Sequence, residues 1–432
     1  MENIIPPFFG KTESDMKIEN IGTEIGPNRA GIYGTVKWED CDRPEQRIYF
    51  ETDSEFSRAL SNTPHSFLVG AILPAMHYGE TRVYIDAAAC PELIDGLLTV
   101  MHWIRNWWYD PTKKLPLIET KIKAELTSPQ VSKRAALFFS GGIDSLATLR
   151  NNHAYYPANH PQYIRDGLLV YGLEVEDPGA FEIAKKSVDA IARDCQVTLI
   201  PAYTNLRMLN ADWVFWRRSF QGAVFSAIAH AFSRRLSSAS ISSSHCICYS
   251  PHYGTHPLLD PNFSSSDFQI KHTCYRLSRL EKTKMVADWD VALRNLRVCN
   301  KYNLYRPDQL NCGQCEKCLI TMMGLIAIGA LDSTSAFGKA DVSADTLKAT
   351  MRLNSEVEHY YEELILPLMQ KGRKDLAHVI QDKLTQYRNK VGRSKRLRIN
   401  SVANTVFKSL KHKSFLNSPV FFSKAFKRGY SK

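Results

Sequence analysis

The strongest constraint on the fold is a six-residue turn that joins two apolar segments. Residues 134–139 read Arg-Ala-Ala-Leu-Phe-Phe, residues 140–145 read Ser-Gly-Gly-Ile-Asp-Ser, and Leu-Ala-Thr-Leu-Arg follows over 146–150. This order predicts a buried strand, a glycine turn and the start of a helix. Such a turn directs backbone N–H groups and a helix N-terminus at one point, which favours the binding of a phosphate group.

The residue types of the turn suit this interpretation. Gly141 and Gly142 permit a positive φ and a close approach of the backbone to a ligand. The serine hydroxyls add donors, and Asp144 can face a magnesium ion or cap the helix. The alternative is an ordinary strand–turn–helix corner that contains serine and glycine by chance. The predicted cofactor-binding residues are Ser140, Gly141, Gly142, Ile143, Asp144 and Ser145, of which Asp144 and Ser145 are also predicted to be catalytic.

From about residue 129 the chain alternates between strand and helix patterns. This rhythm predicts an α/β fold with a doubly wound parallel sheet, in which ligands bind outside the carboxyl ends of the strands. Gly172 lies near the end of the second expected strand, where its backbone could approach a bound cofactor. The expected strands cover residues 134–139, 167–174, 196–201 and 239–243, and the expected helices cover about 177–195 and 212–236.

The remaining chain divides into three further regions. Residues 1–128 mix strand and helix patterns and predict an accessory α+β domain. Residues 129–335 form the predicted α/β domain, which includes the cysteines at 299–318, and residues 336–390 predict a helical extension. Residues 391–432 are a basic tail that interleaves Lys and Arg with Phe.

The net charge of +11 is concentrated near the C-terminus. Residues 371–432 contain 17 Lys and Arg residues against only Asp375 and Asp382, so the rest of the chain is slightly acidic. One interpretation of the 391–432 tail is a patch for RNA, DNA or an acidic membrane surface. The other is a solvated tail without a partner, and both stay open.

The sequence carries no signal for a membrane or secretory protein. No stretch reaches the roughly 18 uninterrupted apolar residues that a membrane span needs. The first residues, Met-Glu-Asn-Ile-Ile-Pro-Pro, lack a basic region followed by a hydrophobic run. We therefore expect a cytoplasmic enzyme whose ten cysteines are reduced thiols or metal ligands.

Four of those cysteines have the spacing of a metal site. Cys299 is followed after 12 residues by Cys312, Cys315 and Cys318 at two-residue intervals. Zinc prefers four soft ligands in a tetrahedron, and a C-x₂-C turn places two sulfurs on one ion. We predict a structural Zn²⁺ site here. An iron–sulfur cluster is the alternative, because cysteines also hold such clusters.

The loop at 140–145 resembles the pyrophosphatase loop of the N-type ATP pyrophosphatases, the PP-loop superfamily. Together with the segment from Val298 to Leu319, it resembles the 7-cyano-7-deazaguanine synthases (QueC-like proteins). The resemblance covers about residues 134–325 and implies the adenine nucleotide alpha hydrolase-like (HUP) fold. The spacer between the first two cysteines is longer than in that family, and residues 1–128 and 335–432 have no counterpart in its compact members.

The resemblance implies an ATP-dependent, AMP-forming ligase. Such an enzyme uses ATP and Mg²⁺ to adenylate a carboxylate, on a small molecule or carried by a protein, for attack by ammonia or an amine. A 7-deazaguanine-type compound is one candidate acceptor. Two alternatives stay open. One is an RNA-modifying PP-loop enzyme of the thiolase type, with the tail holding RNA. The other is a conjugating component of an antiviral or polysaccharide-biosynthesis system.

Basic residues downstream are candidates for the charge that adenylation requires. Arg276, Arg279 and Lys282 are expected on one helical face that suits a carboxylate or a phosphate. We predict Arg276 and Lys282 to be catalytic, and the alternative is a solvated basic helix. The loop with His252, His256 and Asp260 could form a wall of the substrate site.

Overall fold

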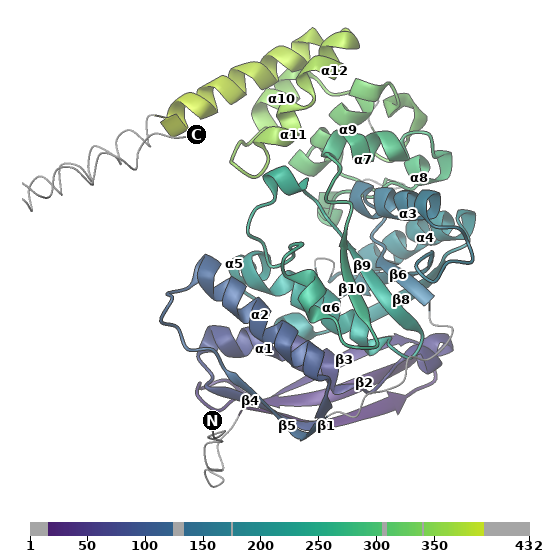
Figure 1. The fold of residues 1–432 in the computed structure, drawn as a ribbon. Helices are drawn as coiled ribbons and strands as arrows, with labels where there is room; N and C mark the ends of the chain where they lie inside the picture. The colour runs from purple at the N-terminus through teal and green to yellow at the C-terminus, as the bar shows by residue number, and fades with distance from the viewer. Residues whose placement is uncertain (1–15, 124–133, 174–175, 305–308, 339–340, 393–432) are drawn as a thin grey trace, which may run out of the picture.

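A ten-stranded sheet forms the centre of the molecule in the computed structural model, which describes residues 16–123, 134–173, 176–304, 309–338 and 341–392 (Figure 1). The strand order is β10-β9-β6-β7-β8-β3-β2-β1-β4-β5. The strands are β1 (Met16–Ile25), β2 (Arg29–Lys37), β3 (Gln46–Asp53), β4 (Arg82–Ala89), β5 (Leu117–Lys123), β6 (Arg134–Phe138), β7 (Ile164–Tyr171), β8 (Thr198–Thr204), β9 (Leu236–Ser242) and β10 (Gln269–Thr273).

The five strands from β10 to β8 are all parallel. Helices α3 (Ile143–Tyr155) and α4 (Pro178–Asp194) make the first two crossovers, and the direction of strand addition then reverses between β6 and β9. Ligands of open α/β sheets bind at such a reversal, outside the carboxyl ends of the strands. The fold is therefore α/β with a mostly parallel sheet, and it is compatible with the predicted doubly wound arrangement.

The helix expected over 212–236 is shorter and interrupted. It consists of α5 (Trp213–Phe215), a π-helical turn over Trp216–Phe220 and α6 (Gln221–Ala231). A tight turn follows, in which the Leu236 N–H donates to the Phe232 carbonyl, and β9 begins three residues earlier than expected. The side chains of Phe232 and Leu236 are both buried. The apolar pattern of the sequence therefore continues through this turn, although the helix ends before it.

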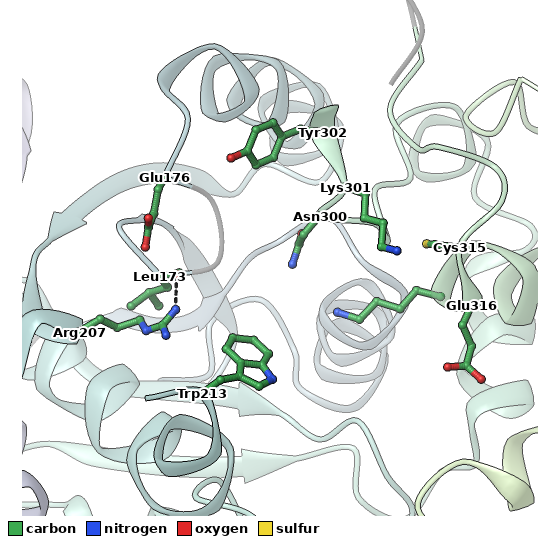
Figure 2. Close-up of a pocket in the computed structure, with 10 residues that line it drawn as sticks. Leu173, Glu176, Arg207, Trp213, Asn300, Lys301, Tyr302, Cys315 and Glu316 are labelled. Carbon is green, nitrogen blue, oxygen red and sulfur yellow. Dashed lines mark hydrogen bonds between the residues drawn. The ribbon is translucent and has the colours of Figure 1, made fainter. Parts of the chain in front are cut away.

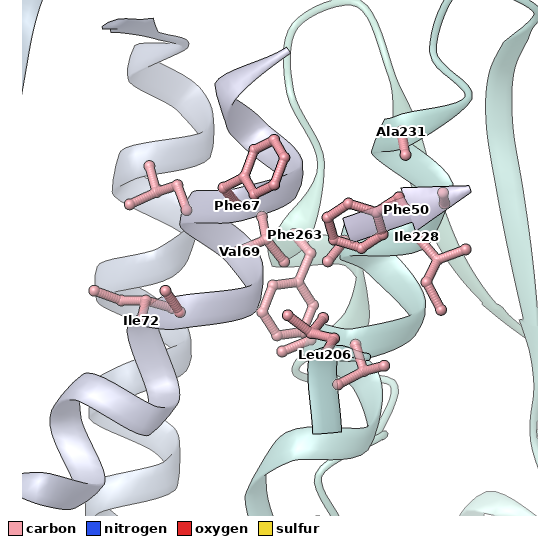
Figure 3. Close-up of a cluster of buried hydrophobic side chains, with 14 of the residues drawn as sticks. Phe50, Phe67, Val69, Ile72, Leu206, Ile228, Ala231 and Phe263 are labelled. Carbon is pink, nitrogen blue, oxygen red and sulfur yellow. The ribbon is translucent and has the colours of Figure 1, made fainter. Parts of the chain in front are cut away.

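The first half of the chain extends the same sheet. Strand β3 pairs antiparallel with β8, with Phe50 opposite Thr204. Helices α1 (Pro64–Tyr78) and α2 (Pro91–Trp108) cover one face (Figure 1). Figure 3 shows Phe67 of α1 and Phe263 in one apolar cluster that spans both halves. The accessory region therefore shares a sheet and a core with the parallel half.

Helices dominate the chain after β10. They are α7 (Arg279–Val286), α8 (Asp290–Arg294), α9 (Glu316–Ile328), α10 (Ala344–Thr350), α11 (Glu358–Glu362), α12 (Ile365–Gln370) and a further helix over 374–392. That last helix buries Leu376, Ile380 and Leu384 on one face, in a second apolar core. Residues 393–432, most of the predicted basic tail, lie outside the described residues. None of the described helices is both long enough and apolar enough to span a membrane.

Candidate functional site

The loop at residues 140–145 lies between the carboxyl end of β6 and the first turn of α3. Gly141 has a φ of 75°, which glycine adopts without strain. The Gly142 N–H donates to Ser140 Oγ at 3.4 Å, and Ser145 Oγ donates to the Gly142 carbonyl at 3.0 Å. Gly142 is the N-cap and has no side chain to cap α3, so the first-turn N–H groups are available to an anion.

Asp144 is held between two cations at the start of α3. Its Oδ2 atom accepts from Arg279 Nη1 at 2.7 Å, and its Oδ1 atom lies 3.3 Å from Lys282 Nζ. Burial opposes ionisation of this carboxyl, but the two cations together hold the pKa of Asp144 below its ordinary value. Lys282 is completely buried and also donates to the Ser243 carbonyl. The predicted residues Asp144, Ser145 and Lys282 are thus brought together, with Arg279 beside them.

Arg276 is not part of this group. Helix α7 begins only at Arg279, because Ser278 and Glu281 form a capping box that starts the helix there. Arg276 precedes the cap and is exposed, with its guanidinium 5.8 Å from the Tyr275 ring centroid. The prediction that Arg276 shares a helical face with Arg279 and Lys282 is therefore wrong.

The loop opens on a cleft made of two adjoining cavities. The larger, about 570 Å³, is lined by Ser140, Gly142, Ile143 and Asp144 and by residues of the C-terminal helices. The smaller, about 240 Å³, lies among the ends of β6, β7 and β9 and has apolar walls that include Leu168, Val170 and Ile241. The two cavities share Ser140 and Asp144. The cleft therefore coincides with the point where the strand order reverses.

Gly172 lies one residue beyond the end of β7 with a φ of 94°. A Cβ atom at this position would come within 2.0 Å of the Thr204 carbonyl oxygen of β8. The close contact with β8 is therefore sufficient to require glycine at position 172. The next residue, Leu173, lines the smaller cavity.

Sequence reasoning missed the residues that face the loop from the other side of the cleft. His245 Nδ1 lies 2.8 Å from the Tyr360 hydroxyl, and the two rings are stacked. Burial, reinforced by His359, lowers the pKa of His245 to about 4, so the ring is neutral at neutral pH. The larger cavity is also lined by Arg217, which forms an ion pair with Glu356 at 2.6 Å.

These partners are separated by more than a hundred residues in sequence. No local pattern connects them. They meet only because the helical extension folds back over the carboxyl edge of the sheet.

The three side chains proposed for a substrate wall, those of His252, His256 and Asp260, line neither cavity of the cleft, although Tyr253 of the same loop lines the larger one. Asp260 accepts from Thr255 Oγ1 at 2.7 Å and lies 2.7 Å from His272 Nδ1. His256 is buried, and His252 stacks on Trp107 of α2 at 4.7 Å between ring centroids. The contacts of His252 and His256 with Trp107 join the two halves of the molecule.

The four predicted zinc ligands converge at the N-terminus of α9. The sulfur of Cys299 lies 3.5 Å from that of Cys312 and 3.6 Å from that of Cys315, and the sulfur of Cys318 lies 3.8 Å and 3.5 Å from the same two. Four sulfurs at about 2.3 Å from a tetrahedral zinc ion are about 3.8 Å apart. The cluster is largely buried and could hold a metal ion such as zinc.

The backbone around the cluster is fixed by one amide side chain. The side-chain Oδ1 atom of Asn311 accepts hydrogen bonds from the backbone N–H groups of Val298 and Cys299 at 2.8 and 3.2 Å. Its amide nitrogen donates to the carbonyls of Leu296 and Ala336 at 2.8 and 3.0 Å. Fixed ligand positions of this kind are typical of a structural metal site.

Comparison of the chain with protein-family models, with curated proteins and with solved structures finds no match. A functional interpretation therefore depends on the residues of the cleft and of the cysteine cluster.

Proposed function

We propose that this protein is an ATP-dependent ligase of the PP-loop type, which adenylates a carboxylate and releases pyrophosphate. The observation that carries the proposal is the uncapped N-terminus of α3 at the reversal of the strand order, with Asp144 held between Arg279 and Lys282. An N-terminus with free N–H groups and two adjacent cations suits the leaving pyrophosphate of ATP.

The two cavities suit the two ends of the nucleotide. The apolar walls of Leu168, Val170 and Ile241 suit a flat adenine ring, and the loop beside them suits the phosphates. Asp144 lines the cleft with the carboxylate ligand that Mg²⁺ prefers, so Asp144 and the phosphate oxygens would hold this ion. When bound, Mg²⁺ neutralises charge on the phosphates.

The reaction has two steps. An oxygen of the acceptor carboxylate attacks the α-phosphorus, and the bond to the bridging oxygen breaks, with its electron pair leaving on pyrophosphate. Ammonia or an amine then attacks the acyl carbon, AMP leaves, and the nitrogen gives up a proton. Arg279, which lines the cleft, stabilises the charge that develops in the first step, and the buried Lys282 acts through Asp144 by holding its carboxylate in place. His245, neutral at neutral pH, can accept a hydrogen bond from the nucleophile and orient it.

The cysteine cluster has a structural role in this proposal. A Zn²⁺ ion with four cysteine ligands has no open position for catalysis. It would link the segment after Arg297 to α9, and the Arg297 N–H donates to the Gly141 carbonyl at 3.0 Å. The metal would thereby support the shape of the phosphate loop.

A sulfur-transfer reaction is a second candidate, because two cysteines lie directly beyond His245. The thiols of Cys246 and Cys248 interact, and Cys248 is exposed. That interaction raises the pKa of Cys248, which disfavours the reactive thiolate. Replacing Cys248 with Ser should leave pyrophosphate release unchanged if the ligase proposal holds, and should abolish product formation if sulfur transfer is the reaction.

Product analysis tests the ligase proposal. The full-length protein is incubated with ATP labelled in the α-phosphate, Mg²⁺ and a panel of carboxylic acids with ammonium. We expect labelled AMP and pyrophosphate without ADP, a loss of at least about a hundredfold in Asp144→Asn, and no loss in Asp288→Asn, a matched exposed carboxylate. Formation of ADP, or equal rates in the two variants, would refute the proposal.

A further inference from the structure

A third cavity of about 550 Å³ adjoins the nucleotide cleft on the side of the cysteine cluster (Figure 2). We call it the Trp213 lobe. Its walls include Glu176, Arg207, Trp213, Lys301 and Tyr302. It shares Trp213 and Asn300 with the cavity that contains the phosphate loop, so a molecule in the lobe could extend toward the loop.

Arg207 gives the lobe a fixed positive charge. Its guanidinium donates to the carbonyls of Leu173 and Ala211 at 2.9 and 3.2 Å. It also lies 5.5 Å from the ring centroid of Trp213 and 5.0 Å from that of Trp216. No carboxylate of the described residues forms an ion pair with it. A guanidinium that is held in place before binding and lacks a carboxylate partner favours an anionic ligand.

The other charged residues of the lobe balance one another in number. Lys301 and Lys317 add two cations, against the carboxylates of Glu176 and Glu316. Glu316 already accepts from the Tyr361 hydroxyl at 3.0 Å and the Arg352 N–H at 3.3 Å, so its charge is partly satisfied within the protein. The lobe is therefore lined by one more basic than acidic residue, and Arg207 accounts for that difference.

Two aromatic rings add a preference for a flat ligand. Trp213 is 50% exposed and Tyr302 is 37% exposed, although both are large aromatic residues. In Figure 2 the two rings lie on opposite sides of the cavity, with Arg207 near one end and Lys301 near the other. Exposed aromatic rings in a cavity are typical of sites that bind flat rings by stacking.

We propose that the Trp213 lobe is the acceptor site, and that the acceptor is a flat acid with a second anionic group. The second group pairs with Arg207, and the reacting carboxylate lies toward Asn300 and the phosphate loop. The assignment as acceptor rests on the proposed ligase function, whereas the binding preference rests on the lobe itself. A doubly anionic acceptor distinguishes this site from one that recognises only the carboxylate that reacts.

Binding of simple aromatic acids tests the proposal. Terephthalate, which is flat and carries two carboxylates, is compared with benzoate, which carries one, by calorimetry on the full-length protein. We expect terephthalate to bind at least about tenfold more tightly than benzoate, because only terephthalate has a second carboxylate to pair with Arg207. Arg207→Met should remove this preference, since methionine keeps the apolar contacts with both tryptophans and loses the charge.

Two further variants make the result decisive. Lys301→Met changes an exposed residue and should reduce the preference about threefold without affecting folding. Arg193→Met, at an exposed arginine on α4, should leave it unchanged. Equal binding of the two acids to the wild-type protein, or an unchanged preference in Arg207→Met, would overturn the proposal.

Binding of an ATP analogue with Mg²⁺ is measured in the same samples. If the analogue binds and terephthalate shows no preference, the acceptor-site inference fails and the ligase proposal stands. If terephthalate shows the Arg207-dependent preference and the analogue does not bind, the ligase proposal fails and the anion site stands.

Discussion

The loop at residues 140–145 and the cysteine cluster are both short motifs, but the residues that complete each site come from different distances along the chain. The cluster draws all its ligands from the 20 residues between Cys299 and Cys318, and the four sulfurs already lie near tetrahedral spacing. The loop supplies only N–H groups, two hydroxyls and Asp144. Its cations come from α7, and the opposite wall of the cleft comes from residues 354–360 of the helical extension.

This difference indicates what each motif can specify. A metal site made from neighbouring residues fixes its own chemistry, so the spacing of its ligands is informative by itself. A phosphate loop fixes only where an anion binds. Under the proposed function, the selectivity of the cleft would depend on distant side chains such as Tyr360, which the fold brings to its wall. The predictions below test this contrast between a local site and an assembled one.

The largest effect is expected at the cysteine cluster. Cys318→Ser removes a buried ligand, so we expect loss of the bound metal and a fall of at least about 3 kcal/mol in the free energy of unfolding. Elemental analysis and urea denaturation measure the two quantities. Cys248→Ser, at an exposed cysteine outside the cluster, is the control. A Cys318→Ser protein with wild-type metal content and stability would show that the cluster is no metal site.

Removing a cation from the assembled site should have a smaller effect on stability. Lys282→Met leaves Asp144 with Arg279 as its one remaining cationic partner among the described residues. We expect the free energy of unfolding to fall by about 1–3 kcal/mol in urea denaturation. The fall is moderate because the Asp144 side chain keeps some contact with solvent. We also expect loss of ATP binding. Lys284→Met, two residues away and exposed, should change neither quantity. Wild-type ATP affinity in Lys282→Met would remove Lys282 from the site.

A pH-dependent effect should follow from His245. Its pKa falls from 6.5 to about 4 on folding, so the unfolded chain binds the extra proton first as the pH drops. The contribution of His245 to stability is therefore complete above pH 6.5 and is lost progressively between pH 6.5 and 4. The free energy of unfolding of the wild type minus that of His245→Gln should decline as the pH falls from 6.5 to 4. A difference that is constant with pH would contradict the buried, neutral ring.

The smallest effect is expected for Arg276→Ala. The side chain is exposed and lies before the cap of α7, so stability should change by less than about 0.5 kcal/mol and ATP affinity should not change. Arg279→Ala, three residues later, should weaken ATP binding by at least about tenfold because it removes the ion pair with Asp144. Equal effects of the two variants on ATP affinity in a calorimetric titration would contradict the assignment of Arg279, and not Arg276, to the site.

The sequence predicted the elements that depend on local patterns. The loop, the four cysteines, the parallel strands and the later amphipathic helix all carry their signal within about 20 residues. The start of α7 was also readable, because Ser278-Arg-Leu-Glu281 is a capping box, and this signal would have excluded Arg276 from the helix.

The contacts that the sequence did not predict depend on pairing between distant segments. The β3–β8 contact joins residues about 150 positions apart, and nothing in either strand specifies its neighbour. The ion pair of Arg217 with Glu356 and the contact of His245 with Tyr360 are of the same kind. Such contacts are set by the packing of whole elements, which periodicity in a single sequence does not determine.

The most direct test of the central claim is a crystal structure of the full-length protein with Mg²⁺ and an ATP analogue that has a methylene group between the α- and β-phosphates. The account predicts that the β-phosphate accepts hydrogen bonds from first-turn N–H groups of α3 and from a hydroxyl of Ser140 or Ser145, with adenine against Leu168 and Ile241. A nucleotide bound elsewhere, or a loop that stays empty at saturating analogue, would contradict it.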